Sequence, residues 1–136
     1  MGIFDWLFGK KKEKYIQKIT FKNGIRTIKY YYENNQLYQE GIQKDRKKHG
    51  LWKQYYKNGQ LRGEFNYKEG TQHGIQNTYY ENGQLKLEGN KINGIFDGVL
   101  KMYYENGQLE TEANMKDGEL ISKKCWSEDG NETECK

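Results

Sequence analysis

Two histidines are the first side chains to consider for chemistry, because an imidazole can act as a general base or bind a metal ion. His49 and His73 are the only histidines in the 136 residues, they lie 24 residues apart, and each stands directly before a glycine. This equivalence predicts two exposed turn residues rather than two partners in one site. No CxxC or HxxxH spacing occurs, so the sequence predicts no metal site.

A row of glutamates is the second candidate for chemistry. Glu64, Glu88 and Glu112 follow Glu40 at the same 24-residue interval. Two carboxylates can share acid–base work, but an evenly spaced row is more typical of cross-strand pairing with Lys or Arg, or of a solvated face. The sequence also has no phosphate-binding GxxxxGK loop. We therefore expect no enzyme activity, no catalytic residues and no cofactor.

An internal repeat must position these side chains. The motif YYENNQL at 31–37 returns as YYKNGQL at 55–61 and as YYENGQL at 79–85 and 103–109, a period of 24 residues. Gly50, Gly74 and Gly98 each stand five residues before a tyrosine pair. Matches at so many offsets indicate an array of one supersecondary unit.

Each unit is expected to contain a β-hairpin. Asn-Gly at 58–59, 82–83 and 106–107 lies between strand-like runs and predicts two-residue type I′ turns, with Asn34-Asn35 as a weaker version in the first unit. The second connection, for example 69–74, is expected to be longer. Further hairpins are expected at Asn23-Gly24 and Asp129-Gly130. The fold prediction is all-β: an elongated, twisted antiparallel meander of stacked hairpins over residues 15–136, preceded by a short helical or irregular segment at 1–14.

The two faces of the sheet should differ. A two-residue turn at 106–107 places Tyr104 opposite Leu109. Strand alternation then gives one more apolar face, formed in this unit by Leu100, Met102, Tyr104, Leu109, Thr111 and Ala113. The other face mixes Tyr with charge and carries Val99, Lys101, Tyr103, Glu110 and Glu112. With 12 Tyr but one Ala and one Val, the chain suits a thin sheet rather than a thick aliphatic core.

The net charge of +4 belongs to the start of the chain. Residues 1–29 hold eight basic and two acidic residues, whereas the remainder holds 15 and 17. The periodic tyrosines have Glu beside them as often as Lys. This near-neutral body predicts no nucleic-acid binding.

The motif YYxNGQLxxEG, followed by a G-x3-G step, resembles the bacterial variant of the MORN repeat (membrane occupation and recognition nexus). The resemblance covers about residues 16–136 and departs from the pattern at Asn35, at Arg46 and at Ala113. It implies the elongated sheet described above. Single-protein arrays of this kind are similar to the YwqK family of antitoxin or immunity proteins, whose partners are toxins that include nuclease-like and deaminase-like ones.

The resemblance implies a function in which the chain binds a cognate protein toxin and occludes its active site. Repeat sheets suit this role because side chains can vary while the turns stay fixed. The expected contacts, chosen because interface cores are rich in aromatic residues, are Trp52, Tyr55, Tyr79, Tyr103, Glu64, Glu88 and Glu112. The alternative is a non-enzymatic MORN scaffold at a membrane surface or on another protein partner. Exposed sheet edges also favour an end-to-end homodimer.

The first 14 residues form an amphipathic, basic segment. Its apolar and basic side chains are Phe4, Trp6, Leu7, Phe8, Lys10, Lys11 and Lys12. They suit weak contact with a membrane surface, and the rival interpretation is docking on the first hairpin. The apolar stretch precedes the charges, the reverse of a signal peptide, so we expect a cytoplasmic protein. In the scaffold alternative it is peripheral at the inner face of the membrane.

Two cysteines, Cys125 and Cys135, fall on opposite sides of the last expected turn. Their placement on adjacent strands is compatible with a disulfide. A cytoplasmic location favours two reduced cysteines instead. The spacing leaves both states open.

Overall fold

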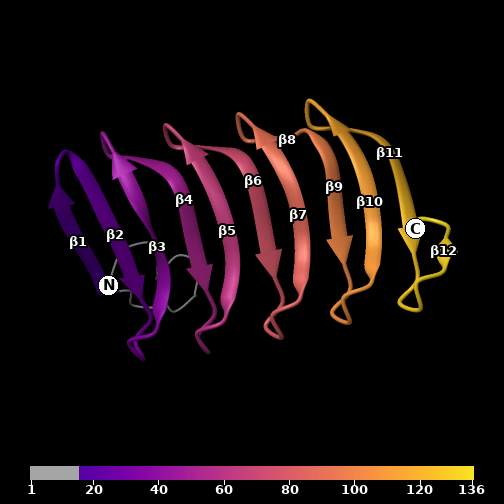
Figure 1. Cartoon of the computed structure of the whole chain (residues 1–136), viewed down its shortest axis with the longest axis horizontal. Helices are drawn as coiled ribbons and strands as arrows, with labels where there is room; N and C mark the ends of the chain where they lie inside the picture. Colours follow the sequence, from indigo (N-terminus) through magenta and orange to yellow (C-terminus); the bar gives the residue numbers. More distant parts are fainter. Residues whose placement is uncertain (1–15) are drawn as a thin grey trace, which may run out of the picture.

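The computed structural model describes residues 16–136, which form one antiparallel sheet of 12 strands. Figure 1 shows the strands following one another along the sheet. Each pairs with its neighbours in the sequence except at β8, which pairs only with β7, so that β7 also pairs directly with β9. The strands are β1 (Ile16–Lys22), β2 (Ile25–Tyr31), β3 (Leu37–Lys44), β4 (Lys47–Tyr55), β5 (Leu61–Lys68), β6 (Thr71–Tyr79), β7 (Leu85–Ile92), β8 (Ile95–Phe96), β9 (Gly98–Tyr103), β10 (Leu109–Lys116), β11 (Glu119–Trp126) and β12 (Glu132–Thr133). This confirms the predicted all-β meander. The expectation for residues 1–14 lies outside the described residues.

The two kinds of turn are exchanged relative to the prediction. The two-residue turns lie at the connection that was expected to be longer, and the first example is the predicted hairpin at Asn23-Gly24. In each of them both central residues have positive φ, as type I′ turns require: Asn23 and Gly24, Asp45 and Arg46, Glu69 and Gly70, Asn93 and Gly94, and Asp117 and Gly118. Arg46, at φ 63°, occupies a position where the later units have glycine.

The Asn-Gly pairs after the tyrosines form three-residue loops instead. In the second unit the Gly59 N–H donates to the Tyr56 carbonyl at 2.9 Å, and the Tyr56 N–H donates to the Gln60 carbonyl at 2.8 Å. Only the glycine has positive φ, 88° at Gly59. Asn58 is needed for its side chain, because its Oδ1 accepts the Gln60 N–H at 2.9 Å. The prediction of type I′ turns here is therefore wrong; the geometry is a type I turn closed by a left-handed glycine.

This loop changes the register at its base. The residue opposite Leu109 is Tyr103, whereas Tyr104 was predicted to occupy this place. A bulge then precedes the pair formed by Thr111 and Met102. Beyond the bulge the predicted faces are recovered, since Ala113 lies opposite Leu100 and Glu112 opposite Lys101.

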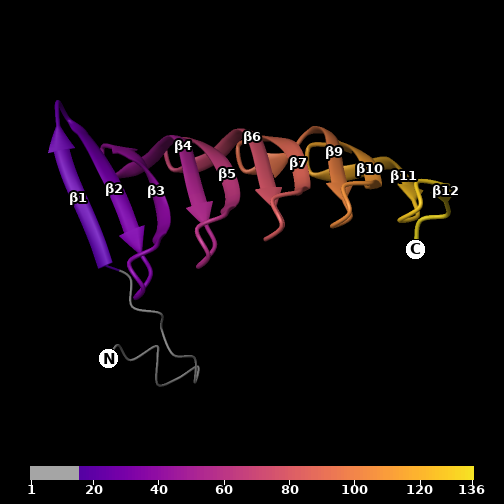
Figure 2. The same cartoon turned by 60° about the horizontal axis from the view of Figure 1, so that its bottom comes forward.

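The core is one row of side chains across a single face, which we call the core face. Along the row, glycine or alanine lies beside a large residue at both ends, and three large residues follow one another in the middle. The row consists of Ile28, Gly41, Trp52, Phe65, Gln76, Gly89, Leu100 and Ala113. Trp52 and Ile28 are each only 1% exposed. The Trp52 ring lies over Gly41, and its indole N–H donates to the Ile42 carbonyl at 2.9 Å. Figure 2 shows the described residues as one curved layer. No second layer packs on the described sheet, so the buried side chains of this row are covered by their neighbours in the same sheet.

The second tyrosine of each pair joins one unit to the next. The Tyr32 hydroxyl donates to the Tyr55 carbonyl at 2.9 Å, and Tyr56 does the same to Tyr79 at 2.6 Å. Tyr80 and Tyr104 repeat the contact with the carbonyls of Tyr103 and Trp126. These bonds fix the spacing of neighbouring hairpins at the ends of the strands, next to the three-residue loops.

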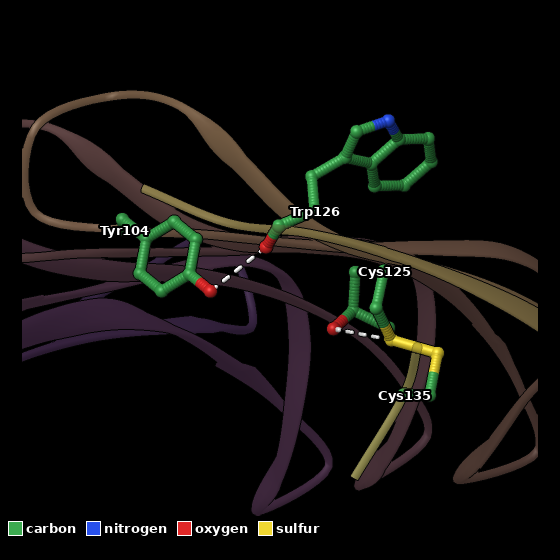
Figure 3. The surroundings of a disulfide bond; sticks show 5 residues. Tyr104, Cys125, Trp126 and Cys135 are labelled. Carbon is green, nitrogen blue, oxygen red and sulfur yellow. Dashed lines mark hydrogen bonds between the residues drawn. A yellow bond between two sulfur atoms is a disulfide. The ribbon is translucent and has the colours of Figure 1, made fainter. Parts of the chain in front are cut away.

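The C-terminal end of the sheet is closed by a disulfide between Cys125 and Cys135, whose Cα atoms are 5.2 Å apart. Figure 3 shows it beside the bond from the Tyr104 hydroxyl to the Trp126 carbonyl. The bridge ties β12 and the chain end to β11. The interpretation of two reduced cysteines is therefore not the state that the structure describes.

Candidate interaction face

The side chains predicted to contact a partner lie mostly on the face opposite the core, which we call the open face. Each unit supplies it with three residues from one strand and two from the next. Strands β4, β6 and β9 supply an aliphatic residue, a central residue and a tyrosine: Leu51, Lys53 and Tyr55; Ile75, Asn77 and Tyr79; Val99, Lys101 and Tyr103. Strands β5, β7 and β10 supply Asn66 and Glu64, Asn90 and Glu88, and Asn114 and Glu112.

The tyrosines and glutamates of the open face are bonded to each other. The Tyr55 hydroxyl donates to Glu40 at 2.9 Å, and Tyr79 donates to Glu64 at 2.8 Å. Tyr103 repeats the bond with Glu88 at 2.7 Å. Because each tyrosine reaches back to the preceding unit, we call Tyr55, Tyr79 and Tyr103 the ladder tyrosines. What they offer a partner is the ring surface rather than a free hydroxyl.

Burial and the accepting carboxylate both favour the neutral phenol. Desolvation is the larger cause, and the hydrogen bond to Glu40 adds to it, so that the pKa of Tyr55 rises to about 12. The pKa of Tyr79 and that of Tyr103 rise to about 12 for the same reasons. The hydroxyls of the ladder tyrosines are therefore uncharged near neutral pH.

Charges alternate in a row across the middle of the open face. The register aligns Lys29, Glu40, Lys53, Glu64, Asn77, Glu88, Lys101, Glu112 and Lys124 on successive strands. Lys29 Nζ lies 3.7 Å from Glu40 Oε2. This agrees with the cross-strand pairing predicted for the glutamates.

Asn77 interrupts this alternation. It stands where neighbouring units have Lys53 and Lys101, so Glu64 and Glu88 flank a neutral residue at the centre of the sheet. The Asn77 Oδ1 is buried and has no hydrogen-bond partner among the described residues. The centre of the open face is thus locally acidic.

An exposed aliphatic row runs beside the charges, and the sequence analysis did not select it. Leu51, Ile75 and Val99 are 43%, 60% and 48% exposed. A shallow hollow of about 380 Å³ involves Ile75 and Val99 together with Glu88, Lys101 and Glu112. The signal was present in the sequence, because the three residues directly follow Gly50, Gly74 and Gly98.

Three predicted residues need correction. Trp52 belongs to the core row and is 1% exposed, so it has no surface to give to a partner. His49 and His73 lie within β4 and β6 rather than in turns, and both are half-buried. His73 Nδ1 accepts the Asn93 N–H at 3.2 Å. Residues 16–136 contain no group of three potential metal-binding side chains.

The predicted membrane contacts in residues 1–14 lie outside the described part of the chain. Among the described residues, no helix is long and apolar enough to cross a membrane.

The stacked hairpins, the repeated glycines and the two tyrosine networks define a β-repeat protein in which each unit contacts its sequence neighbours. A family model described as MORN repeat variant matches residues 27–45, 48–69, 72–90 and 96–117. These ranges cover more than half of the chain, so the chain belongs to the MORN repeat variant family. No curated protein matches the sequence at a significant level. MORN repeats are compatible with a scaffold for protein interaction.

Proposed function

We propose that this chain is a non-enzymatic protein-binding module and that its partner is a cognate protein toxin, which it neutralises by covering the active site. The observation that carries the binding role is the aliphatic row on the open face. Three large aliphatic side chains are exposed in line, on a face where the three ladder tyrosines are bonded to glutamates of the preceding units. Exposed apolar surface arranged in this way is typical of interaction sites.

The choice of a toxin as partner rests on the resemblance to antitoxin arrays, and the electrostatics of the open face support it. Glu64, Glu88 and Glu112 give this face carboxylates on three successive units. A nuclease-like toxin has a basic substrate groove, and complementary charge speeds docking and selects the partner. Because the ladder tyrosines hold two of these carboxylates in place, the surface is organised before binding.

Co-expression with the product of the adjacent gene tests the proposal. We expect that product to arrest growth alone and to be harmless beside this protein, and we expect the two to co-purify. A matched control is the Trp52→Ala variant, whose core is damaged and whose protection should fail. The proposal is refuted if the adjacent product is harmless alone or stays toxic in the presence of the intact protein.

The alternative role is a scaffold at the inner face of a membrane, favoured by the apolar and basic residues of the first 14 positions. Lipid flotation of the full chain and of a variant lacking residues 1–14 separates the two roles. If the full chain floats with the lipid and the shortened variant does not, the result supports the scaffold role. Absence of flotation in both forms rejects the membrane role and leaves toxin binding as the proposal.

A further inference from the structure

We infer that the aliphatic row of the open face binds a basic amphipathic α-helix of the partner, laid across the strands. This inference rests on the proposed protein-binding role and specifies its partner. It starts from the spacing of Leu51, Ile75 and Val99, which lie on β4, β6 and β9. One strand separates each pair, β5 in the first case and β7 in the second. Neighbouring strands lie about 4.8 Å apart, so the aliphatic side chains recur about every 10 Å.

An α-helix matches this interval. It rises about 1.5 Å per residue, so residues seven apart are about 10.5 Å apart and face nearly the same side. An extended peptide also covers about 10 Å in three residues, but its side chains alternate, and those at i and i+3 point to opposite faces. It therefore cannot place a side chain on Leu51, Ile75 and Val99 in turn. A helix of about 15 residues with apolar positions i, i+7 and i+14 can.

The charges of the open face determine which residues should flank the apolar positions of the bound helix. Glu64 and Glu88 lie on the strands to either side of Ile75, and Asn77 replaces the lysine that the repeat places between them. Each of these carboxylates accepts a ladder tyrosine hydroxyl at Oε1 and lies opposite one lysine, Lys53 for Glu64 and Lys101 for Glu88. On the side of Asn77 neither carboxylate faces a cation. A helix bearing Lys or Arg beside its central apolar residue would satisfy both.

The C-terminal end of the row adds a further acceptor. Glu112 has no ladder tyrosine, because Ser127 occupies the position one period after Tyr103. Its carboxylate borders the hollow of about 380 Å³ that Ile75 and Val99 help to form. The charged residues that line this hollow are Glu88, Glu112 and Lys101. Because the two carboxylates outnumber the one ammonium group, the hollow favours a side chain with an apolar stem and a cationic end, Lys or Arg, on the bound helix.

The test uses the whole protein and a synthetic helical peptide of about 18 residues. The peptide carries Leu at three positions seven apart and Lys beside the central Leu, with a fluorophore for anisotropy. Two control peptides have the same length: one has the same composition with the Leu residues five apart, and the other has Glu in place of Lys. We expect the first peptide to bind at least about tenfold more tightly than either control.

Two variants and one matched control variant locate the site. Ile75→Thr keeps a β-branched side chain on an exposed position, and it should weaken binding of the Lys peptide about tenfold. Ile95→Thr is the matched control, since Ile95 is 49% exposed but lies outside the row, and it should bind as the unaltered protein does. Asn77→Lys restores the repeat pattern of Lys53 and Lys101, and it should weaken the Lys peptide and strengthen the Glu peptide.

The inference is overturned if the Lys peptide does not bind, if the five-residue spacing binds equally well, or if Ile75→Thr and Asn77→Lys leave its affinity unchanged. These outcomes are distinct from failure of the proposed function. Should Ile75→Thr still protect fully against the toxin in co-expression, toxin binding stands and the open face is the wrong surface. Should the unaltered protein give no protection while the peptide pattern holds, the helix-binding face stands and its partner is not a toxin.

Discussion

A methyl group added at Gly41 should strongly destabilise the sheet. A Cβ at this position would lie 2.5 Å from Trp52 Cγ and closer still to the fused ring. Carbon atoms pack at about 3.5–4.0 Å, so the ring would have to move by at least about 1 Å. Trp52 is only 1% exposed and has no solvent-filled space into which it can turn.

Two costs add up in the Gly41→Ala variant. Overpacking of a buried site costs about 1–3 kcal/mol. Movement of the ring also breaks the indole N–H bond to the Ile42 carbonyl, which is worth about 1 kcal/mol. We therefore expect a loss of about 2–4 kcal/mol in the free energy of unfolding. Thermal unfolding followed by circular dichroism should show a Tm lowered by roughly 6–15 °C.

A double-mutant cycle with Trp52→Leu tests the cause. Leu is the residue found two units later, where Leu100 lies against Gly89, the equivalent of Gly41. A Cβ at Gly89 would meet Leu100 at Cδ1, 2.7 Å away, which is the end of a flexible side chain that can move aside more easily than a fused ring. In the Trp52→Leu background, Gly41→Ala should cost less than about 1 kcal/mol, which corresponds to a coupling of more than about 1 kcal/mol. Additive effects of the two substitutions would refute the reasoning, because Gly41 would then be required for a reason other than the indole ring.

Three further predictions concern the turns, the ladder and the disulfide. Arg46→Gly should raise the free energy of unfolding by about 1 kcal/mol, because glycine adopts the positive φ at this position without strain. Gly70→Ala should lower it. Urea unfolding measures both changes, and midpoints equal to that of the unaltered protein would contradict the prediction. Since the folded pKa of the ladder tyrosines is about 12 against an ordinary 10.0, their stabilising effect is complete below pH 10 and is lost as pH rises towards 12. Tm should fall across that window, and Tyr79→Phe should make the fall shallower. Reduction of the Cys125–Cys135 bridge, with 10 residues of separation, should cost about 2–3 kcal/mol, and a Cys125→Ser, Cys135→Ser variant should be insensitive to reductant.

The strands were predictable because the tyrosine motif and the residues around it occur four times at the same spacing. The turns were not, since Asn-Gly satisfies two geometries. A type I′ turn needs positive φ at both residues, whereas a three-residue loop needs it only at the glycine. The Asn58 side chain accepts a hydrogen bond from the Gln60 N–H. In a type I′ turn Asn58 would instead adopt a positive φ, and nothing in the local sequence distinguishes these two roles. The packing of whole strands, which places Tyr55 opposite Leu61, decides between them.

The candidate site was predictable in part. Strand alternation places the ladder tyrosines and the glutamates on one face, as their common offset indicates. Trp52 was assigned to the contacts because of its residue type, but its parity places it in the core row. Val99 was placed on this face as well, but Ile75 and its equivalents were not selected because single exposed aliphatic residues are common on protein surfaces. The disulfide depends on how closely the chain end after β12 approaches β11, which sequence spacing does not determine.

The order of the strands also sets how the protein responds to tension. Strands β1 and β12 lie at opposite ends of the sheet (Figure 1), and ladder hydrogen bonds run perpendicular to the strands. A pull between these ends therefore acts along the hydrogen bonds and opens them one pair after another, as in a zipper, rather than shearing a whole ladder at once. Under stretching the array should extend hairpin by hairpin in many small steps at low force, while the bridge at Cys125 keeps the last turn closed.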